Sequence, residues 1–225
     1  MSEKCANCGQ DAPEAYCPHC GQKTRIGLPT IPELIADGLA ALFSYDGKLW
    51  RSIRELLLRP GGLTLDFLRG KRQPYLTPIQ LFVWLQAITF LAHRLWFDPA
   101  HTDSISKLVL ILGGLCWVSL CIAYADRREP VLKHLVMTAH NWSFMMLYLL
   151  ALYSLLPTVA GLVARIGWVH GPVQIGPIAT YSTIAVMAIY TFFALRRVYA
   201  QSVAITLLRT SLVTALTIGG VLLVR

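Results

Sequence analysis

The chain has 225 residues, of which 55% are hydrophobic and only 14% are charged, and its mean hydropathy is +0.54. Soluble domains carry about 25% charged residues, so this composition excludes an ordinary soluble domain and indicates a membrane protein. The net charge of +8 does not indicate a nucleic-acid partner, because the basic residues stand beside apolar segments. That arrangement is typical of cytoplasmic loops facing anionic membrane lipids.

The first element, residues 1–24, contains two C-x2-C motifs in the stretch CANCGQDAPEAYCPHCGQK. Four thiolates at this spacing suit a tetrahedral zinc ion, and the eight residues between the pairs are too few for a hydrophobic core. Metal would therefore supply the folding free energy, and four cysteines leave no open coordination position. We predict a zinc-ribbon head with a structural Zn²⁺ held by Cys5, Cys8, Cys17 and Cys20.

Other interpretations of this head stay open at the level of the sequence. Iron in the same geometry and a redox dithiol or disulfide pair are two of them, and His19 could replace one ligand. Zinc thiolates indicate a reducing compartment, which places the N-terminus in the cytoplasm. The first thirty residues hold no apolar stretch, so we expect no secretory signal peptide.

Residues 25–75 are predicted to form amphipathic helices at the cytoplasmic interface. Thr30 and Glu33 have the spacing of a capping box at the start of a first helix. A second helix, from about Gly47 to Arg59, has an apolar stripe that includes Trp50 and a basic opposite face. Such a helix fits the bilayer interface, and the alternative is packing on this protein or on a partner.

A short helix around Leu65 to Leu68, stopped by Gly70, is predicted next. The basic cluster beside it consists of Arg69, Lys71 and Arg72. We expect these side chains to contact lipid phosphates, and a specific site for an anionic ligand is the alternative.

The paired CxxCG and CPxCGQK motifs, the helix end LLLRPGG and the stretch FLRGKRQPYLTPIQLFVW together resemble the DUF3667 family. The resembling stretch covers roughly residues 5–95. Members of this family are bacterial membrane proteins of unknown function with an N-terminal zinc-ribbon-like motif. The resemblance implies the architecture, but it implies no activity and no catalytic residue.

Residues 76–225 are predicted to form a transmembrane helical domain, because about twenty apolar residues cross a bilayer. Five stretches qualify, which makes the predicted fold an all-α polytopic membrane protein. We interpret the glycine- and proline-rich segment 157–177 as an outer loop with a short interfacial helix. The predicted spans are 78–97, 108–125, 136–156, 178–195 and 203–224.

Basic residues test the orientation of these spans. The cluster before the first span, the Arg127–Arg128 pair and the Arg196–Arg197 pair would all lie on one side. The positive-inside rule makes this side cytoplasmic. We therefore predict a multi-pass protein of the bacterial inner membrane, with its N-terminus in the cytoplasm and its C-terminus outside.

Four polar residues inside the predicted spans form a candidate layer near the cytoplasmic surface: Gln86, His140, Asn141 and Arg209. At 1.5 Å per residue they lie at a shared depth of about 6–12 Å. Three interpretations compete: ordinary helix–helix hydrogen bonds with a snorkelling arginine, a site for a lipid headgroup or another anion, and catalysis with His140 as general base. No carboxylate lies within a predicted span, which argues against catalysis and against proton-coupled transport.

The function favoured by the sequence is non-enzymatic. The zinc head and basic interfacial helices would dock a cytoplasmic protein partner, or brace a membrane assembly, in contact with membrane lipids. The first alternative is a small transporter or lipid-handling protein that uses Arg209, His140 and Gln86. A membrane enzyme is the second alternative, and no catalytic residue is assigned.

Overall fold

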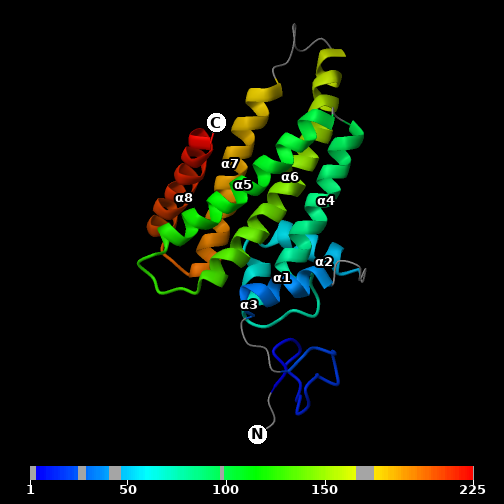
Figure 1. Ribbon diagram of the computed structural model, residues 1–225, viewed down its shortest axis with the longest axis vertical. Helices are drawn as coiled ribbons and strands as arrows, with labels where there is room; N and C mark the ends of the chain where they lie inside the picture. Colours follow the sequence, from blue (N-terminus) through cyan, green and yellow to red (C-terminus); the bar gives the residue numbers. More distant parts are fainter. Residues whose placement is uncertain (1–3, 25–28, 41–46, 97–98, 166–174, 225) are drawn as a thin grey trace.

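The computed structural model describes residues 4–24, 29–40, 47–96, 99–165 and 175–224, and these residues form eight helices and no named strand (Figure 1). The coarse prediction of an all-helical protein is confirmed. The helices are α1 (Ile31–Ala40), α2 (Lys48–Leu58), α3 (Gly62–Leu68), α4 (Pro78–Trp96), α5 (Pro99–Ala123), α6 (Val131–Arg165), α7 (Ile175–Tyr199) and α8 (Val203–Val224).

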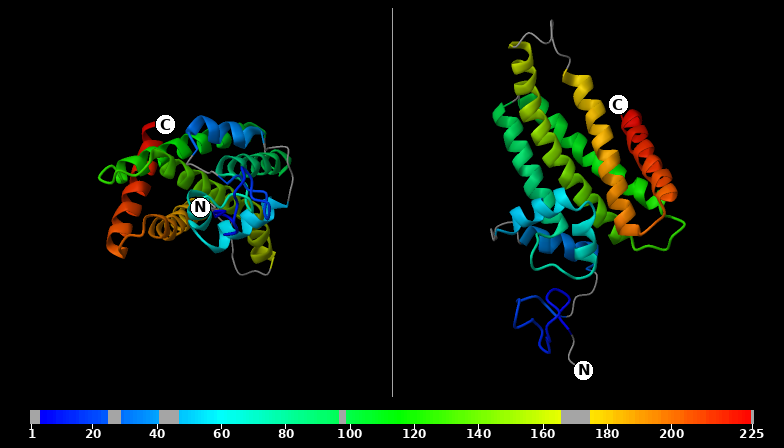
Figure 2. Two further views of the ribbon diagram at one scale, coloured as in Figure 1. Left: turned by 90° about the horizontal axis from the view of Figure 1, so that it is seen from below. Right: turned by 180° about the vertical axis from the view of Figure 1, so that it is seen from behind.

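Helices α4, α6, α7 and α8 run roughly along the long axis of the molecule, and α5 crosses the bundle obliquely (Figure 1). Helices α1–α3, which we call the platform, lie across one end of this bundle, and residues 4–24 lie beyond them (Figure 2). The connections between α5 and α6 and between α7 and α8 lie at the same end (Figure 1). The segments with the basic pairs and the cysteines therefore share one end of the molecule.

Three of the described helical segments are long and apolar enough to cross a membrane: Val131–Leu155, Pro177–Tyr199 and Val203–Gly220. Two shorter apolar segments, Pro78–Ala92 and Ile111–Ala123, belong to α4 and α5. Each predicted span thus overlaps one long helix, but a total of five crossings is not confirmed. The helices are compatible with a membrane protein.

Two helices extend beyond the spans predicted for them. Helix α5 begins at Pro99 rather than near residue 108, because proline is well suited to the first turn, where its missing N–H is not needed. Helix α6 continues to Arg165, so residues 157–165 are helical rather than a loop. Proline inside a membrane helix removes one hydrogen bond without ending the helix. The rest of the predicted outer loop, residues 166–174, lies outside the described residues.

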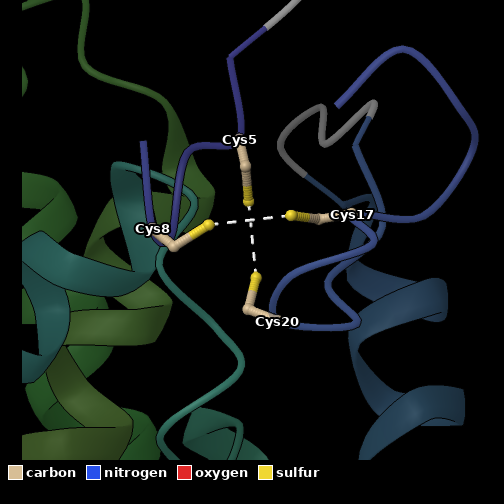
Figure 3. Close-up of side chains that lie close together, drawn as sticks. All are labelled: Cys5, Cys8, Cys17 and Cys20. Carbon is tan, nitrogen blue, oxygen red and sulfur yellow. Dashed lines mark hydrogen bonds between the residues drawn. The ribbon is translucent and has the colours of Figure 1, made fainter. Parts of the chain in front are cut away.

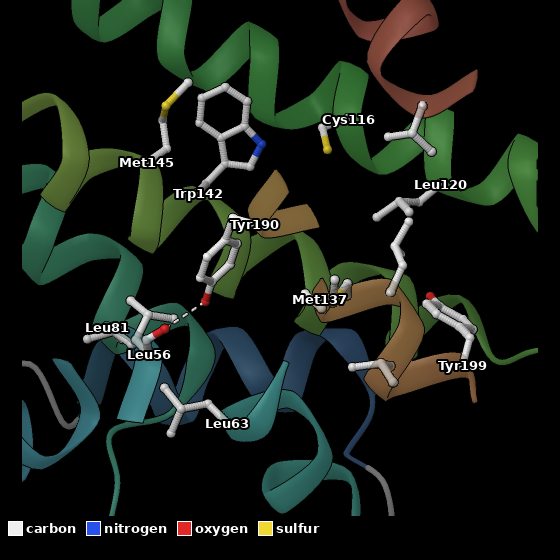
Figure 4. Packing of buried hydrophobic residues seen from close by; sticks show 14 of the residues in the cluster. Leu56, Leu63, Leu81, Cys116, Leu120, Met137, Trp142, Met145, Tyr190 and Tyr199 are labelled. Atoms are coloured by element: carbon white, nitrogen blue, oxygen red, sulfur yellow. Dashed lines mark hydrogen bonds between the residues drawn. The ribbon is translucent and has the colours of Figure 1, made fainter. Parts of the chain in front are cut away.

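Helix α6 is central in the bundle. Of its candidate span, 56% is buried by the rest of the protein, against 28% for α7 and 17% for α8. Met137 and Trp142 of α6 are buried in the core that Figure 4 shows. Met146 is also buried, and Phe144 stacks on Tyr190 of α7 with ring centroids 3.7 Å apart. The outer helices instead expose large apolar side chains, as a lipid-facing surface requires.

The platform is joined to this core mainly through α2 and α3. The Tyr190 hydroxyl donates to the Leu56 carbonyl at 2.9 Å, as Figure 4 shows, and Arg197 donates to the Pro60 carbonyl at 2.8 Å. Gly61, with φ +75°, lies so close to α7 that an added Cβ would be 2.8 Å from the Ala194 carbonyl oxygen. Position 61 therefore favours glycine for two reasons: the positive φ angle strains other residues, and the contact with α7 leaves no room for a side chain.

Helix α2 has one face packed on the protein and another face exposed, so it combines features of the two interpretations, protein packing and bilayer interface. Leu56 is buried on the protein, whereas Trp50 is 68% and Leu58 is 67% exposed.

The capping box at the start of α1 is present, because the Thr30 N–H donates to Glu33 Oε2 at 2.8 Å. This bond and the one from the Thr30 hydroxyl lower the pKa of Glu33.

Candidate functional site

The four N-terminal cysteines converge on one point (Figure 3). Their sulfur atoms all lie within 4.8 Å of one another, with Cys5 Sγ 3.6 Å from Cys20 Sγ and Cys8 Sγ 3.6 Å from Cys17 Sγ. Tetrahedral zinc with Zn–S bonds of 2.3 Å would separate its sulfur ligands by roughly 3.8 Å. The donor set therefore fits a metal ion of this size.

Each pair of cysteines lies on a turn of the same design. The Cys5 N–H donates to the Gln10 carbonyl and the Gly9 N–H to the Cys5 carbonyl, both at 2.8 Å. The second turn repeats both bonds at Cys17, Gly21 and Gln22 with the same lengths. Gly9 and Gly21 have φ values of 75° and 71°, which glycine adopts without strain. Two equivalent turns thus present two thiols each to the centre.

The thiols do not titrate alike. Backbone N–H donation at Gln22, followed by the Asn7 side chain, lowers the pKa of Cys20 to about 6. For Cys8 the largest influence, the Gln10 backbone N–H, lowers the pKa, but burial and the neighbouring thiols together outweigh it and raise the pKa to about 12. Four thiols this close cannot all ionise without a cation between them, so a bound metal would displace protons from the cluster.

His19 is exposed and is not part of the group of ligating atoms. In the described part of the chain, the only group of three or more histidine, cysteine or acidic side chains suited to a metal is the four-cysteine cluster. Nothing in this geometry requires a histidine ligand.

Gln22 attaches the head, residues 4–24, to the loop that follows α3. Its side chain is only 4% exposed, and its Nε2 donates to the Gly70 carbonyl at 2.8 Å. Its Oε1 accepts the backbone N–H groups of Arg72 at 3.0 Å and Gln73 at 3.1 Å. One amide therefore satisfies three backbone groups of residues 69–73, which we call the basic loop.

Gly70 allows this close contact. Its φ is +84°, and an added Cβ would lie 3.2 Å from Cβ of Ala6 in the head. Within the basic loop, Arg69 and Lys71 are exposed, and the guanidinium of Arg72 lies over the Phe67 ring at 4.5 Å. The predicted lipid-phosphate contacts of Arg69, Lys71 and Arg72 stay a prediction, but the metal centre and these charges are neighbours.

The predicted polar layer is divided among separate contacts. His140 Nδ1 lies 2.9 Å from the Thr64 hydroxyl of α3, and Asn141 Nδ2 donates to Thr191 of α7 at 2.9 Å. Gln86 Oε1 is buried and has no hydrogen-bond partner among the described residues. The two partners come from different elements, α3 and α7, so His140 and Asn141 connect α6 to different parts of the protein.

Arg209 has a different partner. It donates to Asp126 Oδ2 at 2.5 Å, and its guanidinium lies 4.4 Å from the ring centroid of Tyr124. The Asp126 carboxylate, just after α5, is the charge partner that the sequence analysis missed. Asp126 directly precedes the Arg127–Arg128 pair, so in the sequence it resembles a charged residue of a solvated loop.

An aromatic cluster beside Arg209 was also missed. Tyr124 stacks on Tyr199 at 3.9 Å, and His134 Nδ1 lies 2.6 Å from the Tyr199 hydroxyl. Lys133 lies over the Tyr199 ring at 4.5 Å. These residues follow α5, begin α6 and end α7, so no local sequence pattern could have grouped them.

Together, the fold and the site define the class of this protein: an all-helical chain with candidate membrane spans and a four-cysteine cluster suited to a metal ion. Residues 46–90 match the family model DUF3667, described as a protein of unknown function. This match agrees with the predicted resemblance over α2, α3 and most of α4. No curated protein and no solved structure matches the chain.

Proposed function

We propose that this chain is a multi-pass inner-membrane protein whose cytoplasmic zinc-ribbon head and basic platform dock a cytoplasmic protein or brace a membrane assembly. The observation that carries this proposal is the attachment of the head through Gln22 to the basic loop. A closed set of four thiolates suits a structural metal rather than a catalytic one. A metal-stiffened head fixed in this way would present a constant surface to a partner.

The distribution of charge supports the orientation. The end of the bundle with the head also bears the connections that contain Arg127 and Arg128 and the end of α7 with Arg196 and Arg197 (Figure 1). Positive charge gathers on the cytoplasmic side of membrane proteins. This agrees with the reducing compartment that free thiols at a zinc site require.

The surface of α2 supports contact with lipid or with a partner at this end. Trp50, Leu57 and Leu58 are exposed apolar side chains, and Arg51 and Arg54 are exposed basic ones. Tryptophan beside arginine is typical of a helix at the membrane interface.

Transport or lipid handling through Gln86, His140 and Arg209 stays an alternative from the sequence, as does an enzyme with His140 as base. Neither gains support from the contacts above. Arg209 pairs with Asp126 and His140 with Thr64, so these two side chains are engaged in separate places.

Site-specific cross-linking in cells tests the proposed docking. Tyr16 is exposed on the head, and we would replace it with p-benzoylphenylalanine in the full-length chain. Irradiation should capture one defined cytoplasmic protein. The double variant Cys17→Ser/Cys20→Ser should lose this product while the protein stays in the membrane.

Two controls make the result specific. Cys121→Ser removes a half-buried thiol of α5 outside the metal cluster and should leave the product unchanged. A photoreactive residue at Leu155, exposed on α6, should capture no cytoplasmic protein. A product that survives loss of both cysteines would contradict the proposal.

A further inference from the structure

A small pocket lies between α3, the segment that leads into α4, and α6. Its polar lining consists of Lys71, Arg72, Tyr75, Thr77 and His140, and Phe67 forms part of its apolar wall. No aspartate or glutamate is among the residues that line it. The lining thus brings two cations, two hydroxyl groups and an imidazole together around one space.

The hydroxyl groups are suited to donate hydrogen bonds into this space. Burial, followed by the negative charges of Glu55 and Asp66, raises the pKa of Tyr75, so its phenol keeps its proton. The Thr77 hydroxyl accepts the Gln80 N–H at 3.4 Å, which leaves its own proton available to donate. Glu55 is already paired with Arg59, so it competes little for the cations of the pocket.

The chemistry of this lining selects a particular kind of ligand. A phosphate group has several acceptor oxygens and negative charge, and guanidinium, ammonium and hydroxyl donors bind it well. Because α4 begins at Pro78, directly after Thr77, the pocket lies where a headgroup at the membrane surface could enter. We propose that this pocket binds a phosphate group, from a phospholipid headgroup or from free phosphate.

The metal head acts on this site through Gln22. Its Oε1 holds the backbone N–H groups of Arg72 and Gln73, while the Lys71 N–H donates to the Asp66 carbonyl at 2.8 Å. These bonds set the path of the loop that carries both cations. Gln22 is therefore a positioning residue for the phosphate site, although it does not line the pocket. The site does not depend on a protein partner, so a failure of phosphate binding and a failure of the proposed docking can be told apart.

Calorimetry on the purified full-length protein in a neutral detergent tests the site. One arm uses inorganic phosphate and the other dioctanoyl phosphatidic acid, with dioctanoylglycerol as the phosphate-free control. Lys71→Gln should weaken binding about tenfold, since it removes a charge-assisted hydrogen bond. Arg128→Gln is the matched control: Arg128 is exposed in the connection between α5 and α6, outside the pocket lining, and its loss should change affinity less than twofold.

The outcomes distinguish the sources. Binding of both probes supports a site open to free phosphate, and binding of phosphatidic acid alone supports a lipid headgroup. No binding of either probe overturns the proposal, as does equal weakening by Lys71→Gln and Arg128→Gln, which would indicate diffuse surface charge. Gln22→Ala should also weaken binding with both cations still present, and unchanged affinity would remove Gln22 from its positioning role.

Discussion

At the scale of single residues, the cysteine side chains determine whether the head has a defined structure. Only Cys5, Cys17 and Ala12 are buried apolar residues within it, which is far too small a core to fold a domain. We therefore expect bonds to a metal ion to supply most of the folding free energy of the head. The identity of that ion as zinc is a proposal that elemental analysis can test.

We expect Cys17→Ser to lose bound metal, because three thiolates and a serine are a poor ligand set for zinc. Elemental analysis of the purified protein should show about one zinc per chain for the unaltered protein and much less for this variant. Cys121→Ser should retain the metal. His19→Gln should also retain it, and loss of zinc from that variant would make His19 a ligand.

Ser52 is a single residue that joins the platform to the start of the bundle. It is fully buried, and its hydroxyl donates to the Lys48 carbonyl at 2.8 Å and accepts the Leu76 N–H at 3.0 Å. Ser52→Ala would leave the buried Leu76 N–H without its partner, which costs about 1–3 kcal/mol. We expect a lower midpoint of thermal unfolding in detergent.

Ser154→Ala is the control for this change. The Ser154 hydroxyl is exposed and donates only to the carbonyl four residues earlier in α6. Its loss leaves no buried donor, so the unfolding midpoint should barely move. Equal shifts for the two variants would show that the Ser52 bridge contributes nothing.

At the scale of elements, the contact between the α2–α3 connection and α7 depends on Gly61. Gly61→Ala adds a methyl group 2.8 Å from the Ala194 carbonyl oxygen, at a backbone angle that alanine adopts with difficulty. Gly47 has a similar φ of +58°, but a Cβ added there would have no atom within 4 Å, so Gly47→Ala has the backbone cost without the clash. The difference between these variants isolates the steric clash from the backbone cost.

We expect Gly61→Ala to lower the free energy of unfolding by about 1–3 kcal/mol more than Gly47→Ala, the usual range for an overpacked contact. Thermal stability measured by size-exclusion chromatography after heating would give the two midpoints. Equal midpoints would mean that α7 moves away at no cost.

How well the sequence predicts an element depends on how local its signals are. The helix predicted from about Gly47 to Arg59 agrees closely with α2, Lys48–Leu58. Its signals are local, because an apolar stripe and the glycines that follow it mark both ends. The start of α5 was missed, since Asp103 and Lys107 resemble a loop although they are compatible with a helix.

Contacts between distant residues could not be predicted. Thr64 and His140 are 76 residues apart, and Gln22 and Gly70 are 48 apart. Periodicity finds the buried face of a helix, but it does not say which neighbour that face meets. The cysteine cluster was predictable because all four ligands lie within one short segment.

At the scale of the whole molecule, basic residues and the head gather at one end of the bundle, and the number of membrane crossings determines what the other end meets. With five crossings, the connection between α4 and α5 lies outside. If only α6, α7 and α8 cross, the same connection remains in the cytoplasm. With the proposed cytoplasmic N-terminus, the C-terminus would lie outside in both cases, so it cannot distinguish them.

Reporter fusions decide between these topologies. We expect alkaline phosphatase joined after residue 98 to be active, because this enzyme folds only outside the cytoplasm. A fusion after residue 130 should be inactive, and green fluorescent protein at that position should fluoresce. Cytoplasmic fluorescence from a fusion after residue 98 would contradict five crossings.

The bond between Gln22 and the basic loop also orders events during synthesis. The four cysteines leave the ribosome before the basic loop and are close enough in sequence to close around a metal before Gly70 emerges. Gly70 and its neighbours are made about fifty residues later. We therefore expect that metal supply to the nascent chain, before the first long helix meets the bilayer, influences whether the finished bundle acquires its attached head.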